Sequence, residues 1–199
     1  QAGFELGNVR YIDLDDVDSQ RFAFLRDRLS FPSLVSRSKM PGPSLDDVLS
    51  VNVFFVQGIV GNILGISLGL PGPAGLHGTQ GSGVIFTSEY MGRQTRDGFG
   101  TAVDGNTFTA QVLAHEVGHY LGLFHTTEQD GVTHDPLSDT PECQGANPSC
   151  PDFDNLMFPF AAATNQVVTP HQSFVLSVNP LTKDPVDDPV RDPSNGGSP

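Results

Sequence analysis

Three histidines and one glutamate between residues 115 and 125 have the types and spacing of a catalytic metal site. The fixed positions are His115, Glu116, His119, Gly122 and His125. Residues four apart lie on the same face of an α-helix, so His115 and His119 can bind one Zn²⁺. Glycine tolerates the turn that ends a helix, so Gly122 allows the chain to bring His125 back to the ion. Three protein ligands leave a fourth position for water, which is typical of catalytic zinc.

Glu116 follows the first histidine directly and is not needed as a ligand. Its expected role is that of general base. It would deprotonate the zinc-bound water and then carry the proton to the leaving amine. The alternative is a helix with three surface histidines and a solvated glutamate. The constellation favours the metal site, because its members together supply a complete mechanism.

The motif requires a helix, and the flanking residues predict one. It should begin at Asn106 or Thr107, run to about Leu121 and end at Gly122. Residues 104–107 include good N-cap types. The apolar residues that follow at roughly helical spacing are Phe108, Val112, Leu113 and Val117.

The chain resembles the metzincins, a clan of zinc peptidases with this extended motif and a methionine turn downstream. Met157 is the matching methionine, because the other two methionines precede the motif. The resemblance implies an α+β fold: a metzincin-like catalytic domain with a twisted mixed β-sheet, an active-site helix, a C-terminal helix and a Met-turn below the zinc. Met157 and Gly122 would be structural residues, with Met157 forming an apolar floor beneath the histidines.

Within the clan, the chain is most similar to the pappalysin family. The similarity covers about residues 107–180 and is carried by residues 115–126, 138–141 and 169–172. It implies a secreted zinc endopeptidase that binds a protein or peptide substrate extended in a cleft. One position departs from the family. Pro159 stands where a tyrosine usually stabilises the oxyanion, so that role is not carried over.

Length and charge agree with one compact enzyme domain. We predict a metallopeptidase catalytic domain over residues 1–180 and a disordered Pro/Asp-rich tail or linker over residues 181–199. The 23 acidic residues exceed the 10 basic ones, and the net charge of −13 argues against nucleic acid or anionic membranes as partners. No apolar stretch reaches the length of about eighteen residues that a membrane span needs. Because the sequence begins at Gln1 without a leader, we expect it to be a mature or trimmed form.

The two cysteines, Cys143 and Cys150, lie between His125 and Met157. In an exported enzyme they would form one disulfide that pins a long loop. The alternative is a pair of free thiols in a cytosolic protein. The even number, the loop setting and the peptidase resemblance favour the disulfide.

The same loop is rich in aspartate: Asp130, Asp135, Asp139, Asp152 and Asp154. Pappalysin-like proteins can bind calcium near this region, and carboxylate oxygens suit Ca²⁺. No EF-hand spacing is present, and a solvated acidic loop is the favoured alternative. Calcium is therefore the lesser of the two cofactor predictions, after Zn²⁺.

The N-terminal half is expected to supply the scaffold. The predicted elements are a strand over 9–14, a helix over 20–29, a loop over 30–44, and strands over 51–56, 63–68 and 83–88. The resemblance implies that the strand over 83–88 is the sheet edge that pairs with extended substrate.

Two other function classes remain open. A zinc-containing binding or toxin module would retain the site without turnover. A serine hydrolase would use Ser67, since residues 65–69 match G-x-S-x-G, but Pro71 and Pro73 follow where that motif requires a helix. The remaining histidines lack ligand spacing and are predicted to be ordinary loop or cap residues: His77, His134 and His171.

Overall fold

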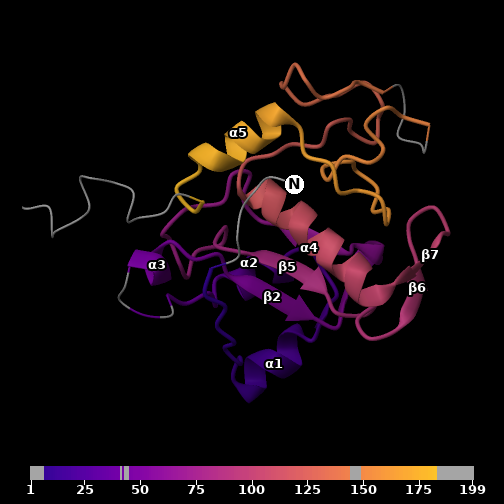
Figure 1. Ribbon diagram of the computed structural model, residues 1–199. Helices are drawn as coiled ribbons and strands as arrows, with labels where there is room; N and C mark the ends of the chain where they lie inside the picture. Colours follow the sequence, from indigo (N-terminus) through magenta and orange to yellow (C-terminus); the bar gives the residue numbers. More distant parts are fainter. Residues whose placement is uncertain (1–6, 41, 43–44, 144–148, 183–199) are drawn as a thin grey trace, which may run out of the picture.

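The computed structural model describes residues 7–40, 42, 45–143 and 149–182. Its helices and strands, in chain order, are α1 (Asp16–Phe22), β1 (Phe24–Leu25), α2 (Ser30–Val35), α3 (Leu45–Val48), β2 (Val53–Val56), β3 (Gly58–Ile59), the 3₁₀ helix η1 (Val60–Asn62), β4 (Gly65–Ser67), β5 (Val84–Thr87), β6 (Gln94–Arg96), β7 (Ala102–Asp104), α4 (Gly105–Tyr120) and α5 (Pro170–Val178). Figure 1 shows their arrangement. The predicted tail lies outside the described residues from residue 183 on.

A three-stranded mixed sheet lies at the centre of the fold. Strand β5 pairs in parallel with β2 on one side and antiparallel with β4 on the other. Two smaller sheets join β1 to β3 in parallel and β6 to β7 antiparallel. This mixed α+β arrangement is compatible with a metzincin-like domain.

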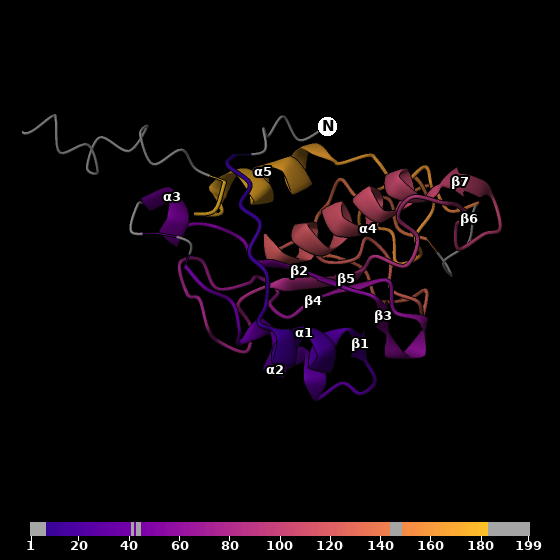
Figure 2. The same cartoon turned by 90° about the horizontal axis from the view of Figure 1, so that it is seen from below.

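Strand β5 is buried along its whole length. Helix α4 covers one face of the sheet, and α1 and α2 cover the other (Figure 2). A continuous apolar run is typical of a strand that is covered on both faces. The main core on the α1–α2 side consists of Phe22, Leu25, Phe31, Leu34, Val35, Val56 and Ile85.

Helix α4 begins and ends close to the predicted bounds. The Asp104 carboxylate caps it by accepting hydrogen bonds from the backbone N–H of Thr107 at 2.9 Å and from its hydroxyl at 3.1 Å. At the other end, the N–H of Leu123 donates to Gly118 O and the N–H of Gly122 donates to His119 O, both at 2.9 Å. These two bonds form a Schellman motif, which places Gly122 at a φ of 111°.

The last helix, α5, begins with a capping box. The Thr169 hydroxyl accepts from Gln172 N, while the Gln172 side chain accepts from Thr169 N. The same Gln172 side chain forms two hydrogen bonds with Asn155, at 2.9 Å and 3.1 Å. The start of α5 is therefore tied to the loop that carries Met157.

Three predictions for the N-terminal half are wrong. Residues 9–14 form no strand, α1 ends at Phe22 where the helix over 20–29 was expected to continue, and α2 lies within the expected loop. Leu29, the last residue of that expected helix, is 86% exposed. The physical reason is nonlocal pairing: residues 24–25 join β3 as a short strand. Proline at position 32 is tolerated because it lies in the first turn of α2.

The prediction that residues 83–88 form the sheet edge is also wrong. They contain β5, which is the middle strand of its sheet. Strand β4 is an edge strand, paired only with β5 among the described residues. It lies against α4, so the edge beside the histidine motif belongs to residues 65–67.

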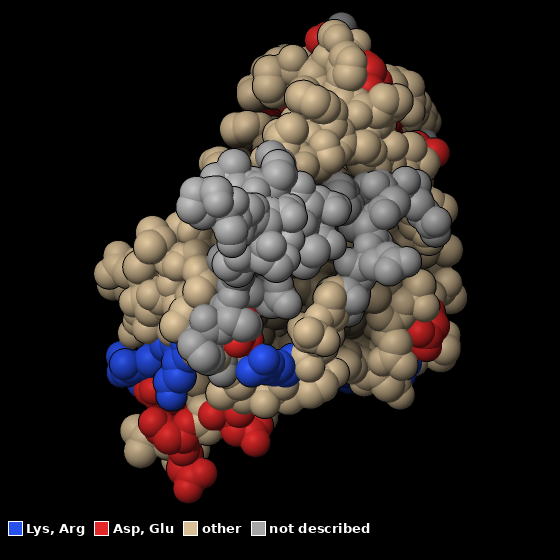
Figure 3. Space-filling view, turned by 60° about the vertical axis from the view of Figure 1, so that its left-hand side comes forward, with Lys and Arg blue, Asp and Glu red and all other residues tan. Residues whose placement is uncertain are grey.

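Basic side chains lie beside acidic ones at one end of the face drawn in Figure 3. Two ion pairs involve the N-terminal segment: Arg37 with Asp18 at 2.9 Å and Arg10 with Asp47 at 2.8 Å. Within the part of the chain that the structure describes, no helix has the length and apolarity to cross a membrane.

Replacing Gly122 by alanine should destabilise the fold, because an L side chain is strained at a φ of 111°. We expect G122A to lower the free energy of unfolding by about 1–2 kcal/mol, measured by urea denaturation. G7A is the matched control, since a methyl group there would meet open space. Equal stability of G122A and wild type would contradict the assigned turn.

Candidate metal and active site

Two histidines of the motif lie one turn apart on α4, and each ring is held from behind by a backbone carbonyl. The Nδ1–H of His115 donates to Leu156 O at 2.7 Å. The Nδ1–H of His119 donates to Leu123 O, also at 2.7 Å. Both carbonyls belong to chain segments that follow the helix. The residues after α4 therefore orient the two rings that α4 presents.

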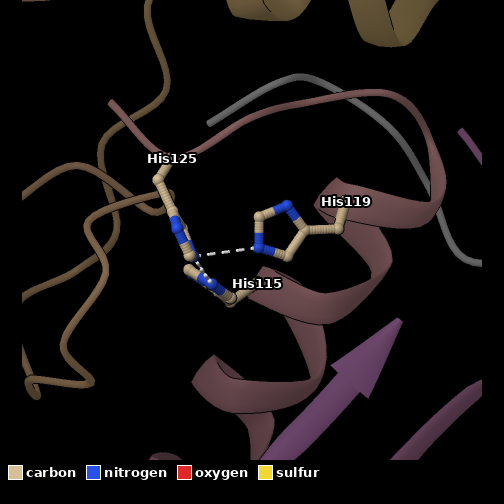
Figure 4. A group of neighbouring side chains, drawn as sticks. All are labelled: His115, His119 and His125. Atoms are coloured by element: carbon tan, nitrogen blue, oxygen red, sulfur yellow. Dashed lines mark hydrogen bonds between the residues drawn. The ribbon is translucent and has the colours of Figure 1, made fainter. Parts of the chain in front are cut away.

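His125 reaches the same place from the loop beyond the Schellman turn. Its Nδ1 lies 2.9 Å from the Oε2 atom of Glu128. Its Nε2 lies 3.2 Å from Nε2 of His115 and 3.1 Å from Nε2 of His119. Figure 4 shows the three rings converging, with dashed lines joining these nitrogen atoms. The structure thus brings together the three predicted ligands.

The convergence fits a zinc ion. Each Nδ1 faces an oxygen acceptor and so carries the proton of the neutral ring, which leaves the lone pair on Nε2. The short Nε2–Nε2 contacts are therefore approaches of lone pairs, since neither atom has a proton to donate. Ligand nitrogens in a tetrahedron at about 2.0–2.1 Å from zinc lie about 3.3 Å apart. The separations of 3.1 and 3.2 Å are close to that value.

Burial keeps two of the imidazoles uncharged. It lowers the pKa of His115 from 6.5 to about 3, with the neighbouring His119 and His125 rings adding to the shift. It lowers the pKa of His119 to about 4, again mainly by desolvation. Neutral imidazole is the form that binds a metal. The three rings form the one all-histidine group with metal-ligand spacing among the described residues.

Glu116 lies on the side of α4 that faces β4. Its side chain packs against Gly65, where an added Cβ would lie 2.6 Å from the Glu116 Cγ atom. Burial raises the pKa of the carboxyl to about 7, and a backbone hydrogen bond from Ser67 partly opposes the shift. Gly65 is therefore needed for the close approach of strand and carboxyl. This strand contact could not be predicted from the sequence, because no local pattern pairs residue 65 with residue 116.

Met157 lies in a tight turn and is fully buried. The turn is closed by the N–H of Phe158, which donates to Asn155 O at 3.0 Å, while the Asn155 side chain accepts from Met157 N at 2.8 Å. A Cβ on Gly118 would lie 2.6 Å from the Met157 sulfur. The thioether therefore packs directly on α4 between its two histidines, together with Leu123.

The predicted disulfide between Cys143 and Cys150 is present. It lies beside Phe158 in a small aromatic cluster. Several aspartates of the same loop have local structural roles. Asp130 accepts hydrogen bonds from the turn that follows it, and Asp139 accepts one from the first turn of α5. Buried Asp152 accepts from two threonine hydroxyls.

The calcium prediction gains no support from this geometry. Among the described residues, no three carboxylates come within ligand reach of one another. The group around Asp152 includes only Cys143 and Cys150, whose sulfur atoms are already joined. One buried oxygen of Asp135 and one of Asp152 have no hydrogen-bond partner. Two such oxygens are far fewer than the six to eight that Ca²⁺ takes.

The other residues considered from the sequence have ordinary contacts. The Ser67 hydroxyl donates to Gly69 O at 2.7 Å, and β4 is followed by a turn where a nucleophile elbow needs a helix. The remaining histidines bond loop or cap groups, as predicted: His77 with Asn52 and Val48, His134 with Thr127, and His171 with Asp139.

A family model places the chain among known proteins. The peptidase M43 model, described as pregnancy-associated plasma protein-A, matches residues 51–187. That range holds 137 of the 199 residues and includes the central sheet, α4, the histidine group and α5. No curated protein and no solved structure matches the chain.

The metal-free site should couple stability to pH in two opposing ways. The pKa values of His115 and His119 are lowered on folding, so their contribution is complete above 6.5 and is lost as the pH falls toward 4. The pKa of Glu116 is raised, so its contribution is present below 4.5 and is lost as the pH rises through about 7.

E116Q should therefore lose stability more steeply than wild type as the pH falls from 7 to 5. The difference should be on the order of 1–3 kcal/mol, measured by chemical denaturation of chelator-treated protein. E142Q, which changes an exposed glutamate, should follow the wild-type curve. Parallel curves for E116Q and wild type would show that the Glu116 carboxyl is not held in its neutral form.

Proposed function

The chain belongs to the pappalysin family of metzincin-type zinc metallopeptidases, and from this premise we propose that it is a secreted endopeptidase. His115, His119 and His125 would hold the zinc, and Glu116 would act as the general base. The observation that carries the proposal is the convergence of three imidazoles beside a buried carboxyl whose pKa is about 7. The Cys143–Cys150 disulfide supports export to an oxidising compartment.

A zinc ion held by the three rings would supply Lewis acidity, polarising the scissile carbonyl and lowering the pKa of water. Glu116 takes a proton from the attacking water while the water oxygen bonds to the carbonyl carbon. When the C–N bond breaks, the same carboxyl delivers that proton to the amine nitrogen. A carboxyl with a pKa of about 7 can both accept and release a proton near neutral pH.

The substrate should be a protein or peptide that lies extended along β4. This strand is an edge of the central sheet, so an added strand can pair with the side that faces away from β5. Gly65 and Ser67 of β4 contact Glu116 directly. A chain paired with β4 would therefore pass beside the general base. Pairing through main-chain groups tolerates many side chains, as an endopeptidase requires.

Met157 and Gly122 would serve the site without touching substrate. The thioether of Met157 packs on Gly118, between the two helical ligands, and would form their apolar floor. The backbone of Gly122 allows the chain reversal that carries His125 to the other rings. Both roles are structural.

Replacing Glu116 by glutamine should abolish peptidase activity while zinc stays bound, because the base is lost and the ligands remain. We expect a decrease in kcat of at least about 10²–10⁴-fold on casein or fluorogenic peptides. Metal analysis should still find one zinc per chain. A chelator should inactivate the wild type, and added zinc should restore it.

S67A tests the serine alternative, since it removes only the side-chain hydroxyl, which donates to Gly69 O, and leaves the backbone hydrogen bond from Ser67 to Glu116 in place. It should keep wild-type activity. Loss of activity in S67A with insensitivity to chelators would instead indicate a serine hydrolase. Stoichiometric zinc without turnover of any substrate would indicate a binding or toxin module. Full activity of E116Q would refute the proposed role of Glu116.

G65A should also impair catalysis, because its Cβ would collide with the Glu116 side chain and displace it. Misplacement of a catalytic group by about 1 Å costs roughly 10²-fold in rate, so we expect kcat to fall by about 10–100-fold with zinc content unchanged. G81A is the control, since a methyl group there would have no neighbour nearer than 3.6 Å. Equal activity of G65A and wild type would contradict the strand–carboxyl contact.

A further inference from the structure

The three rings of the histidine triad (His115, His119 and His125) differ in what holds their Nδ1 atoms. His115 and His119 donate to backbone carbonyls, which are neutral and belong to the packed chain around α4. His125 faces the carboxylate of Glu128 at 2.9 Å. Among the described residues, Glu128 is the one acidic side chain with a hydrogen bond to the triad.

His125 also differs in its own support. The other two rings come from a regular helix, whereas His125 follows the Schellman turn and lies in a loop. Its side chain is 22% exposed, and that of Glu128 is 41% exposed. Nothing in helical geometry orients the His125 ring. A partner on Nδ1 is therefore needed to choose its tautomer and its rotation.

Glu128 is itself held firmly enough to act as that partner. Its backbone N–H donates to Thr133 O at 2.8 Å, and its carbonyl accepts from Gly131 N at 2.9 Å. The tight loop between them is closed by Asp130, whose carboxylate accepts from the backbone of Val132 and Thr133. The loop over 128–133 thus fixes the backbone from which the carboxylate reaches His125.

We propose that Glu128 is a positioning residue that orients His125 and sets the affinity of the triad for its metal. This inference rests on the proposed zinc site. A carboxylate on Nδ1 keeps the proton there, directs the Nε2 lone pair toward the other two rings and makes the imidazole a stronger donor. It also places one negative charge beside three neutral ligands that must stabilise a divalent cation.

Three substitutions separate the contact from the charge. E128Q keeps an oxygen acceptor of the same length but removes the charge. E128D keeps the charge, but its side chain is one methylene group shorter and holds the carboxylate further from His125. E128A removes both. E142A and E142Q are the matched controls, because Glu142 is an exposed glutamate of the same long loop.

The affinity for Zn²⁺ is measured at constant pH by competition with a chromophoric chelator, and Co²⁺ is added separately for its visible ligand-field spectrum. We expect E128A to bind Zn²⁺ about 10–100-fold more weakly than wild type, with E128Q and E128D between the two. The Co²⁺ bands of E128A should shift, because one ligand is no longer oriented. The Glu142 variants should match wild type in both measurements.

A merely structural role is tested on the chelator-treated proteins. Their melting temperatures should agree within about 2 °C, since a partly exposed His–Glu contact contributes little to the metal-free fold. Three results would each overturn the role of Glu128. They are an unchanged Zn²⁺ affinity of E128A, an equal loss of Zn²⁺ affinity in E142A, and a loss of metal-free stability in E128A that matches its loss of affinity. Absence of metal binding by wild type would overturn the proposed function as well, so the two failures are distinguishable.

Discussion

The reversal of the chain at Gly122 is the constraint on which the rest of the site depends. The two Schellman hydrogen bonds end α4 directly after its second histidine. They place Leu123 so that its carbonyl accepts from His119 and its side chain packs with Met157. Two residues further on, the same reversal delivers His125 to the other rings. One glycine conformation therefore serves the helix end, the core and the histidine group together.

Burial shifts the pKa values of the groups at the site in opposite directions. Desolvation lowers the pKa values of His115 and His119 and raises that of Glu116, because charge is costly away from water. The two histidines are consequently uncharged near neutral pH, while the Glu116 carboxyl is close to its pKa there. Metal binding requires the neutral imidazoles, and proton exchange requires a carboxyl that can be ionised and reprotonated. Keeping Glu116 buried lowers the free energy of unfolding of the metal-free protein once its carboxyl ionises.

The segment between His125 and α5 has little regular structure, and side chains hold it in place. Asn155 and Gln172 join the Met157 turn to the cap of α5, and buried Asp152 ties down the threonines after His125. The disulfide closes the middle of the loop. These contacts position Leu156, whose carbonyl orients His115. An irregular loop can therefore form a defined wall of the site.

Local patterns in the sequence were sufficient for α4, its end at Gly122, the three strands of the central sheet and the disulfide, because neighbouring residues determine caps, turns and strand-forming runs. The same patterns predicted the three histidines as metal ligands and Glu116 as the general base, and these roles stay predictions. The tertiary structure alone decided that β4 is an edge strand, that residues 24–25 form a strand, that Gly65 contacts Glu116 and that Glu128 faces His125. Strand order and the meeting of a strand with a helix arise from packing between distant segments, and no local spacing encodes which segments meet.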